Sequence, residues 1–180
     1  MITLKVYITD NMIININEDI GKETVDKLAN SINQLKSAEK LFIYFASGGG
    51  DIEAIEPFIH IINNNIDIIE IVAYGEIKSS EFEIFFKCMC HRILLNNTLG
   101  MYHHSKVTVN INENGTPSTK FDHANKVWTK NLRDQTISFC KGIEMTDKEI
   151  LEIKQGKDVY FQPKRMQELL KVSQQNINKA

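Results

Sequence analysis

Serine and histidine side chains occur where an α/β protein places catalytic groups, just after short apolar segments. Ser79 and Ser80 follow one such segment and open a helical pattern, and His103 ends another. A serine hydroxyl is a poor nucleophile at neutral pH and needs a base, usually histidine, within hydrogen-bond reach. The histidine in turn needs a carboxylate that holds its tautomer. These residue types predict acyl-transfer chemistry if the fold brings them together. A helix cap for the serines and a structural role for the histidine are the alternatives that the local pattern leaves open.

A glycine run provides a second candidate feature. Ser47 is followed by Gly48, Gly49 and Gly50, after an apolar strand-like run and before a helical pattern. A turn without side chains exposes backbone N–H groups, which suits an anion or a developing oxyanion. The run lacks the lysine and the spacing of a phosphate-binding loop. A simple tight turn is the alternative.

The elements that must position these residues alternate between strand and helix. Such alternation with short connections predicts parallel βαβ units and an α/β fold, with the candidate residues at the ends of strands. Apolar runs predict strands in 13–16, 41–45, 68–73, 91–95 and 100–103, and Leu4, Val6 and Ile8 form an earlier β-rich run. Helical spacing predicts helices over 25–35 with Thr24 as cap, over 52–62 and over 79–89.

The last third of the chain has a different pattern. It predicts a long helix, a shorter capped helix, a loop that carries Asp158, and a final amphipathic helix. The segments are an edge strand over 107–111 with a hairpin turn at Asn114 and Gly115, a helix over 121–140, a capping box from Thr146 to Glu149, a helix that starts at Pro163, and a polar tail over 173–180 that is expected to be disordered.

The composition is that of a globular protein with no electrostatic bias. Of the 180 residues, 42% are hydrophobic, and the formal net charge is -2. We therefore expect one domain over residues 1–180, no nucleic-acid partner and no membrane partner. The odd count of three cysteines fits a reducing compartment, so a cytoplasmic location is expected. Cys88 and Cys90 do not predict zinc, because residues two apart on a helix do not face each other.

Several of these segments together resemble the Clp protease proteolytic subunit and its phage-encoded relatives, from about residue 13 to 172. Tyr44 to Ala54 is similar to that family's strand, glycine turn and helix, and Gly75 to Ser79 is similar to the stretch before its nucleophile. Met101 to His103 matches its Met-x-His, and Asp158 lies where the family keeps its third catalytic residue. The resemblance implies a Clp-protease-like (crotonase-type) α/β fold with a projecting handle at about 105–141.

The resemblance also implies roles for these residues. Ser79 would attack a peptide carbonyl, His103 would take and return the proton, and Asp158 would orient His103. The backbone N–H groups of Gly50 and Ser80 would form the oxyanion hole. The implied function is a serine endopeptidase that acts on polypeptides without cofactor or metal, as in phage proteins that process head or scaffold proteins.

The sequence departs from the family at several points. Lys78 and Glu81 replace small residues on either side of Ser79, and the glycine expected after the final helix is absent. The chain begins at the first strand, which leaves no room for the family's N-terminal helix and axial loops and argues against an ATPase unfoldase partner. These departures keep two alternatives open, a catalytically inactive structural or regulatory subunit and a crotonase-type acyl-CoA enzyme.

The predicted handle helix carries a broad apolar face. Its members, Ala124, Val127, Trp128 and Ile137, recur at helical spacing. An exposed apolar stripe of this kind normally meets a partner, so we expect a homo-oligomer.

Overall fold

The computed structural model describes residues 11–36, 39–104 and 119–177, and it describes no side chains in 119–128. A four-stranded parallel sheet has the order β1-β2-β3-β5, and a three-stranded sheet has the order β4-β6-β7. The strands are β1 (Met12–Ile16), β2 (Leu41–Phe45), β3 (Ile69–Ala73), β4 (Glu76–Lys78), β5 (His91–Leu94), β6 (Leu99–Tyr102) and β7 (Val159–Phe161). The helices are α1 (Lys22–Gln34), α2 (Ile52–Asn63), α3 (Ser79–Lys87), α4 (Thr119–Gly142), α5 (Asp147–Lys154) and α6 (Pro163–Ile177).

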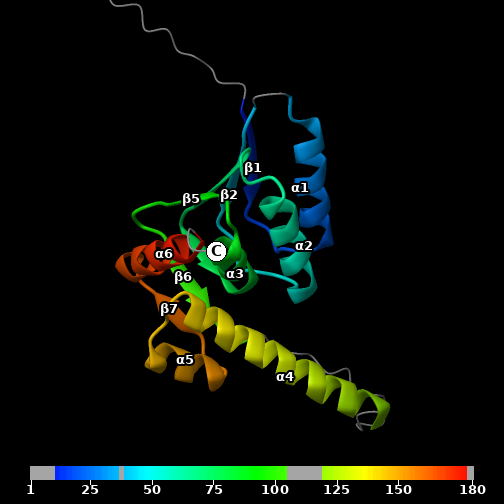
Figure 1. Ribbon diagram of the computed structural model, residues 1–180, viewed down its shortest axis with the longest axis vertical. Helices are drawn as coiled ribbons and strands as arrows, with labels where there is room; N and C mark the ends of the chain where they lie inside the picture. Colours follow the sequence, from blue (N-terminus) through cyan, green and yellow to red (C-terminus); the bar gives the residue numbers. More distant parts are fainter. Residues whose placement is uncertain (1–10, 37–38, 105–118, 178–180) are drawn as a thin grey trace, which may run out of the picture.

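One face of the parallel sheet is buried against helices. Leu41, Ile43 and Phe45 of β2 are fully buried, as are Phe58 and Ile62 of α2. The helices α1 and α2 lie along one face of this sheet (Figure 1). Most residues of β2 and β3 are apolar, so each strand reads as a short apolar run that the sequence predicts well.

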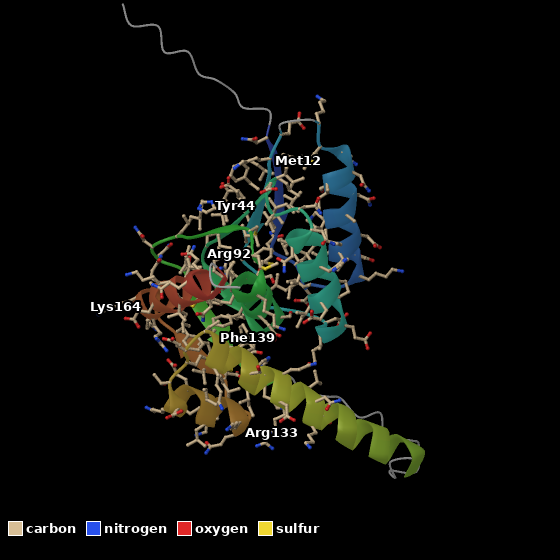
Figure 2. The ribbon with its side chains drawn as sticks, in the orientation of Figure 1. Met12, Tyr44, Arg92, Arg133, Phe139 and Lys164 are labelled. Carbon is tan, nitrogen blue, oxygen red and sulfur yellow. The ribbon has the colours of Figure 1, made fainter. Side chains whose placement is uncertain are left out.

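An aromatic cluster joins the small sheet to the helices. The ring of Phe82 on α3 stacks on Tyr102 of β6 and on Phe161 of β7, with centroids 5.4 and 5.2 Å apart. Phe139, near the C-terminal end of α4, meets Phe82 edge to face (Figure 2). Gly100 lets these layers approach, because a Cβ there would lie 2.3 Å from the sulfur of Met166. The cluster thus packs α3 and the C-terminal end of α4 against β6 and β7.

The helix α4 leaves the body of the protein and projects away from both sheets (Figure 1). Its C-terminal end is anchored by buried Phe139 and Cys140. Ile137 is half-buried, whereas the side chains of Ala124, Val127 and Trp128 lie outside the described residues. None of the described helices has the length and apolar character needed to cross a membrane.

Two helix ends differ from the sequence prediction. The cap of α1 is Gly21, not Thr24, because Thr24 is buried inside the first turn and its hydroxyl donates to the Asp19 carbonyl at 3.1 Å. The helix α3 ends at Lys87, so Cys88 and Cys90 lie beyond it, each buried. Burial raises the pKa of the Cys90 thiol to about 12, which makes it a poor metal ligand or nucleophile at neutral pH.

The predicted disordered tail also differs. The helix α6 continues to Ile177, because Ser173 is buried and packs on the body. Its hydroxyl donates to the Phe86 carbonyl at 2.7 Å and accepts from the Arg92 guanidinium at 2.9 Å. Arg92 (Figure 2) also donates to the Phe85 carbonyl at the end of α3. The early run at Leu4 to Ile8, the strand over 107–111 and the turn at Asn114 lie outside the described residues.

Candidate active site

Ser79, His103 and Asp158 each lie one residue beyond the end of a strand in the three-stranded sheet. β4 ends at Lys78 and β6 ends at Tyr102, while β7 begins at Val159. The parallel register pairs Lys78 with Met101, and the antiparallel register pairs Tyr102 with Val159. Continued by one residue, the second pairing sets His103 opposite Asp158. The strand registers therefore bring the three side chains to one edge of the sheet.

The three side chains form a chain of hydrogen bonds. Ser79 Oγ lies 2.9 Å from His103 Nε2, and His103 Nδ1 lies 3.0 Å from Asp158 Oδ1. An ionised carboxylate only accepts, so Nδ1 carries the proton and Nε2 is free to accept from the serine hydroxyl. That tautomer is the one a general base requires. The side chain of His103 is 22% exposed and that of Asp158 is 43% exposed, so the series of hydrogen bonds runs from the sheet edge toward solvent.

The backbone at Ser79 is held in an unusual conformation. Its φ of 52° lies in the left-handed region, where a residue other than glycine is uncommon. Ser79 stands at the junction between β4 and α3, so this sharp turn presents the hydroxyl at the sheet edge. Strained conformations of this kind cost on the order of 1–3 kcal/mol and cluster at functional sites.

The glycine turn packs against Ser79 through Gly49. A Cβ on Gly49 would lie 2.6 Å from the Ser79 Cβ and 3.2 Å from the Ser80 nitrogen. Gly50 pairs with Ile20 in an isolated parallel bridge, and a Cβ there would lie 2.1 Å from the Ile20 oxygen. The hydrogen bonds of this bridge are made by the Gly49 carbonyl and the Asp51 N–H, so the oxyanion role of the Gly50 N–H stays a prediction. The glycine that touches the serine is thus one position before the one that the sequence singles out. Nothing in a run of identical residues marks which of them makes the approach.

The amide of Ser80 suits an oxyanion because it opens a helix. The first four N–H groups of a helix have no intrahelical partner, and the helix dipole is positive at that end. Ser80 is the second residue of α3, and its side chain is buried. The Gly49 amide, by contrast, donates to the Ser47 hydroxyl at 3.2 Å.

Neither Lys78 nor Glu81 places an unpaired charge beside Ser79. Lys78 forms an ion pair with Glu76 on the same strand, and this hydrogen bond raises the pKa of Lys78. Glu81 is fully buried, and its Oε2 accepts from the Ser47 backbone N–H at 2.6 Å. Burial raises the pKa of Glu81 to about 8, so this carboxyl is mostly neutral at pH 7.

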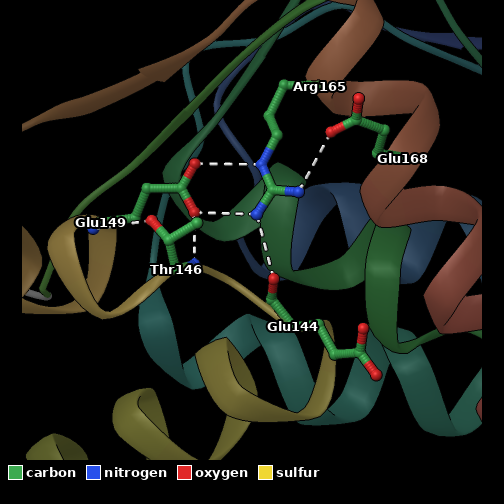
Figure 3. Close-up of polar contacts among 5 residues, drawn as sticks. All are labelled: Glu144, Thr146, Glu149, Arg165 and Glu168. Atoms are coloured by element: carbon green, nitrogen blue, oxygen red, sulfur yellow. Dashed lines mark hydrogen bonds and ion pairs between the residues drawn. The ribbon is translucent and has the colours of Figure 1, made fainter.

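An ion-pair clamp fixes the segment that carries Asp158. Arg165 on α6 donates from Nε and Nη2 to both carboxylate oxygens of Glu149 on α5, at 3.0 and 2.9 Å (Figure 3). The same guanidinium reaches the Glu144 carbonyl at 3.0 Å and Glu168 at 3.3 Å. Glu149 also closes the predicted capping box with Thr146, which is confirmed. The clamp ties together the helices before and after Asp158 and β7.

The residues that the structure describes contain no group of three or more side chains suited to holding a metal ion.

No family model matches the chain, and no curated protein sequence matches it either. Solved structures do match. A mutant of ClpP1 from Listeria monocytogenes superposes with a TM-score of 0.65 and 17% sequence identity, over 89% of this chain and 88% of that one. At this identity the likeness establishes the fold. The chain therefore has a mixed α/β fold, with its parallel sheet and flanking helices, that is similar to the fold of a Clp proteolytic subunit.

Proposed function

We propose that the protein is a serine endopeptidase of the Clp type. The observation that carries this proposal is the continuous hydrogen-bonded chain from Ser79 Oγ through His103 to Asp158, at 2.9 and 3.0 Å. Three residues far apart in the sequence meet in the order and the tautomer that nucleophilic catalysis requires. A crotonase-type acyl-CoA enzyme would have no need of a serine bonded to a histidine in this way.

In the proposed reaction each residue of the site has one role. Ser79 Oγ attacks the peptide carbonyl carbon while His103 Nε2 accepts the hydroxyl proton. The carbonyl oxygen becomes an oxyanion beside the Ser80 amide and the glycine turn, and each such donor contributes roughly 10²–10³ in rate. His103 then returns the proton to the leaving amine, and water hydrolyses the acyl-enzyme in the same sequence of steps. Asp158 stabilises the imidazolium that forms in each half of the reaction.

A fluorophosphonate probe tests whether Ser79 is activated. Intact mass should show one probe adduct on the wild type and none on Ser79→Ala or His103→Ala. Matched controls are Ser138→Ala and His60→Ala, which change exposed residues away from the site and should label like the wild type. Cleavage of an unfolded polypeptide, followed by mass spectrometry, should be lost in the same two variants. A folded wild type that takes no adduct would contradict the proposal.

One observation favours the second candidate, a subunit that keeps the fold without cleaving. The Gly49 amide, which lies beside Ser79, is already bonded to the Ser47 hydroxyl, so it is not free to bind an oxyanion in this conformation. The same experiment separates the two candidates, because an inactive subunit would be folded and unlabelled.

We also propose that the protein assembles with copies of itself through α4. The helix projects from the body (Figure 1), and Ile137, in its C-terminal half, is half-buried and belongs to the predicted apolar face. Multi-angle light scattering should give a mass of several chains at micromolar concentration. A clean monomer would count against assembly and leave the catalytic proposal untouched.

A further inference from the structure

The carboxyl group of Glu81 is fully buried beside the glycine turn. It lies on the first turn of α3 and has no exposed surface. Its Oε2 accepts from the Ser47 N–H, while its Oε1 is buried and makes no hydrogen bond. A buried oxygen without a partner costs free energy that an apolar side chain of the same size avoids. The carboxyl is thus an unfavourable residue for packing alone.

The hydrogen bonds of Ser47 connect this carboxyl to the nucleophile. The hydroxyl of Ser47 accepts from the Gly49 N–H at 3.2 Å, and its carbonyl accepts from the Lys78 N–H at 3.2 Å. Gly49 is the residue that packs on the Ser79 Cβ. A relay of two hydrogen bonds therefore runs from Glu81 through Ser47 to the glycine beside the nucleophile.

The relay works without a net charge beside Ser79. Burial raises the pKa of Glu81 to about 8, and hydrogen bonds from Ser47 and Ala46 oppose this only in part. A neutral carboxyl still offers an acceptor oxygen to the Ser47 N–H. The charged and titratable groups on the elements around α3 have other partners: Lys78 pairs with Glu76 on β4, Lys87 with Glu56 on α2, Tyr102 on β6 with Glu83, and Arg165 on α6 with Glu149.

We propose that Glu81 is a positioning residue that holds the Ser47–Gly50 turn against Ser79 and thereby keeps Gly49 packed beside the candidate nucleophile. The consequence for reactivity rests on the proposed peptidase function, whereas the effect on the turn does not. Glu81 acts through Ser47 and touches no substrate. Its acceptor oxygen is the feature that matters, so an amide of the same shape should replace it and a thioether should not.

The first test is amide hydrogen exchange at Ser47 and Gly49, measured by NMR on the full chain. Glu81→Gln keeps an acceptor oxygen and should leave both rates within about twofold of the wild type. Glu81→Met has similar length and no strong acceptor, and it should speed exchange at both amides by about tenfold, the loss expected for one hydrogen bond. Ser47→Ala removes only the second link, so it should speed exchange at Gly49 and spare Ser47. Unchanged exchange in Glu81→Met and Ser47→Ala would overturn the proposal.

The second test is the rate of fluorophosphonate labelling at Ser79 in the same variants. Glu81→Met should label at least about tenfold more slowly with an unchanged melting temperature, and Glu81→Gln should label like the wild type. Faster exchange together with unchanged labelling would overturn the positioning role. A wild type that does not label would refute the peptidase proposal, while the exchange rates would still decide whether Glu81 holds the turn. If Glu81→Met does not fold, Ser47→Ala tests the second link by itself: exchange at Gly49 should speed up and labelling should slow down.

Discussion

The two ends of the hydrogen-bonded chain are held by different kinds of force. Ser79 is fixed by backbone geometry: a left-handed turn, a strand register, and a glycine that leaves no room for a Cβ. Asp158 is 43% exposed and lies in a loop whose neighbours are held by a partly exposed ion-pair clamp around Arg165. Steric constraints of the first kind do not depend on solvent, whereas ion pairs weaken with salt. The Ser79 end is therefore the more rigid of the two, and the Asp158 end, which depends in part on ion pairs, is the more adjustable.

The sharpest way to break the rigid end is Gly49→Ala. The added Cβ would lie 2.6 Å from the Ser79 Cβ, and the backbone φ of +109° disfavours any side chain. We expect complete loss of fluorophosphonate labelling. Gly48→Ala is the matched control, since its Cβ would find no atom closer than the Asp19 carboxylate at 4.0 Å and should label normally. Equal labelling in the two variants would show that Gly49 does not constrain Ser79.

The adjustable end is tested by Asp158→Asn. An amide in this position can donate to Nδ1 and favour the wrong histidine tautomer, so labelling should fall by roughly 10⁴-fold. Because Asp158 is exposed, the melting temperature should stay within a few degrees of the wild type. A large loss of stability would instead mean that Asp158 is a structural residue.

The clamp itself is tested by Arg165→Met, with Lys164→Met as control. Arg165 bonds Glu149 through two nitrogens, whereas Lys164 is an exposed neighbour on the same helix. Loss of this partly buried pair should lower the unfolding free energy by about 1–3 kcal/mol and slow labelling severalfold. Urea unfolding at two salt concentrations measures the unfolding free energy, and the fluorophosphonate assay measures the labelling rate. The wild type should lose more stability with salt than Arg165→Met does, and the opposite trend would exclude a role for the ion pair.

The smallest expected effect is a dependence of stability on pH that comes from Glu81. Glu81 has a pKa of about 8 in the folded protein, raised by burial from an ordinary value of 4.5. Between these values the folded state holds a proton that the unfolded state has lost, so stability falls as pH rises. Relative to Glu81→Gln, the wild type should lose about 1.4 kcal/mol of unfolding free energy between pH 6 and pH 7. Parallel curves for the two proteins would mean that Glu81 is ionised in the fold.

The sequence was most informative where a local pattern of residues defines the element. The runs of β2 and β3, the stripe of α2 and the capping box at Thr146 are predicted close to their observed bounds, because each is specified by local pattern alone. The ends of α1 and α3 are missed, since a glycine cap and an early stop leave weak local signals. The short strands β4 and β7 have too few residues to show an alternation.

The same distinction applies to the site. Ser79, His103 and Asp158 are found from chemistry and resemblance, and the structure brings all three into hydrogen-bond reach. Gly49 is not found, because which glycine of a run approaches the serine depends on where Gly50 pairs with Ile20. The link from Glu81 to Ser47 joins residues 34 positions apart, and no local pattern indicates it.

The antiparallel register of β6 and β7 has a consequence for how this chain tolerates length changes. Since successive residues of a strand face opposite sides, one inserted or deleted residue in Val159–Phe161 would turn Asp158 to the other side of the sheet or move it out of line with His103. The loop between α5 and β7 is not paired with a strand, so a change in its length does not reverse the side on which a residue lies. Insertions and deletions should therefore be tolerated in residues 155–157 but not from Asp158 onward.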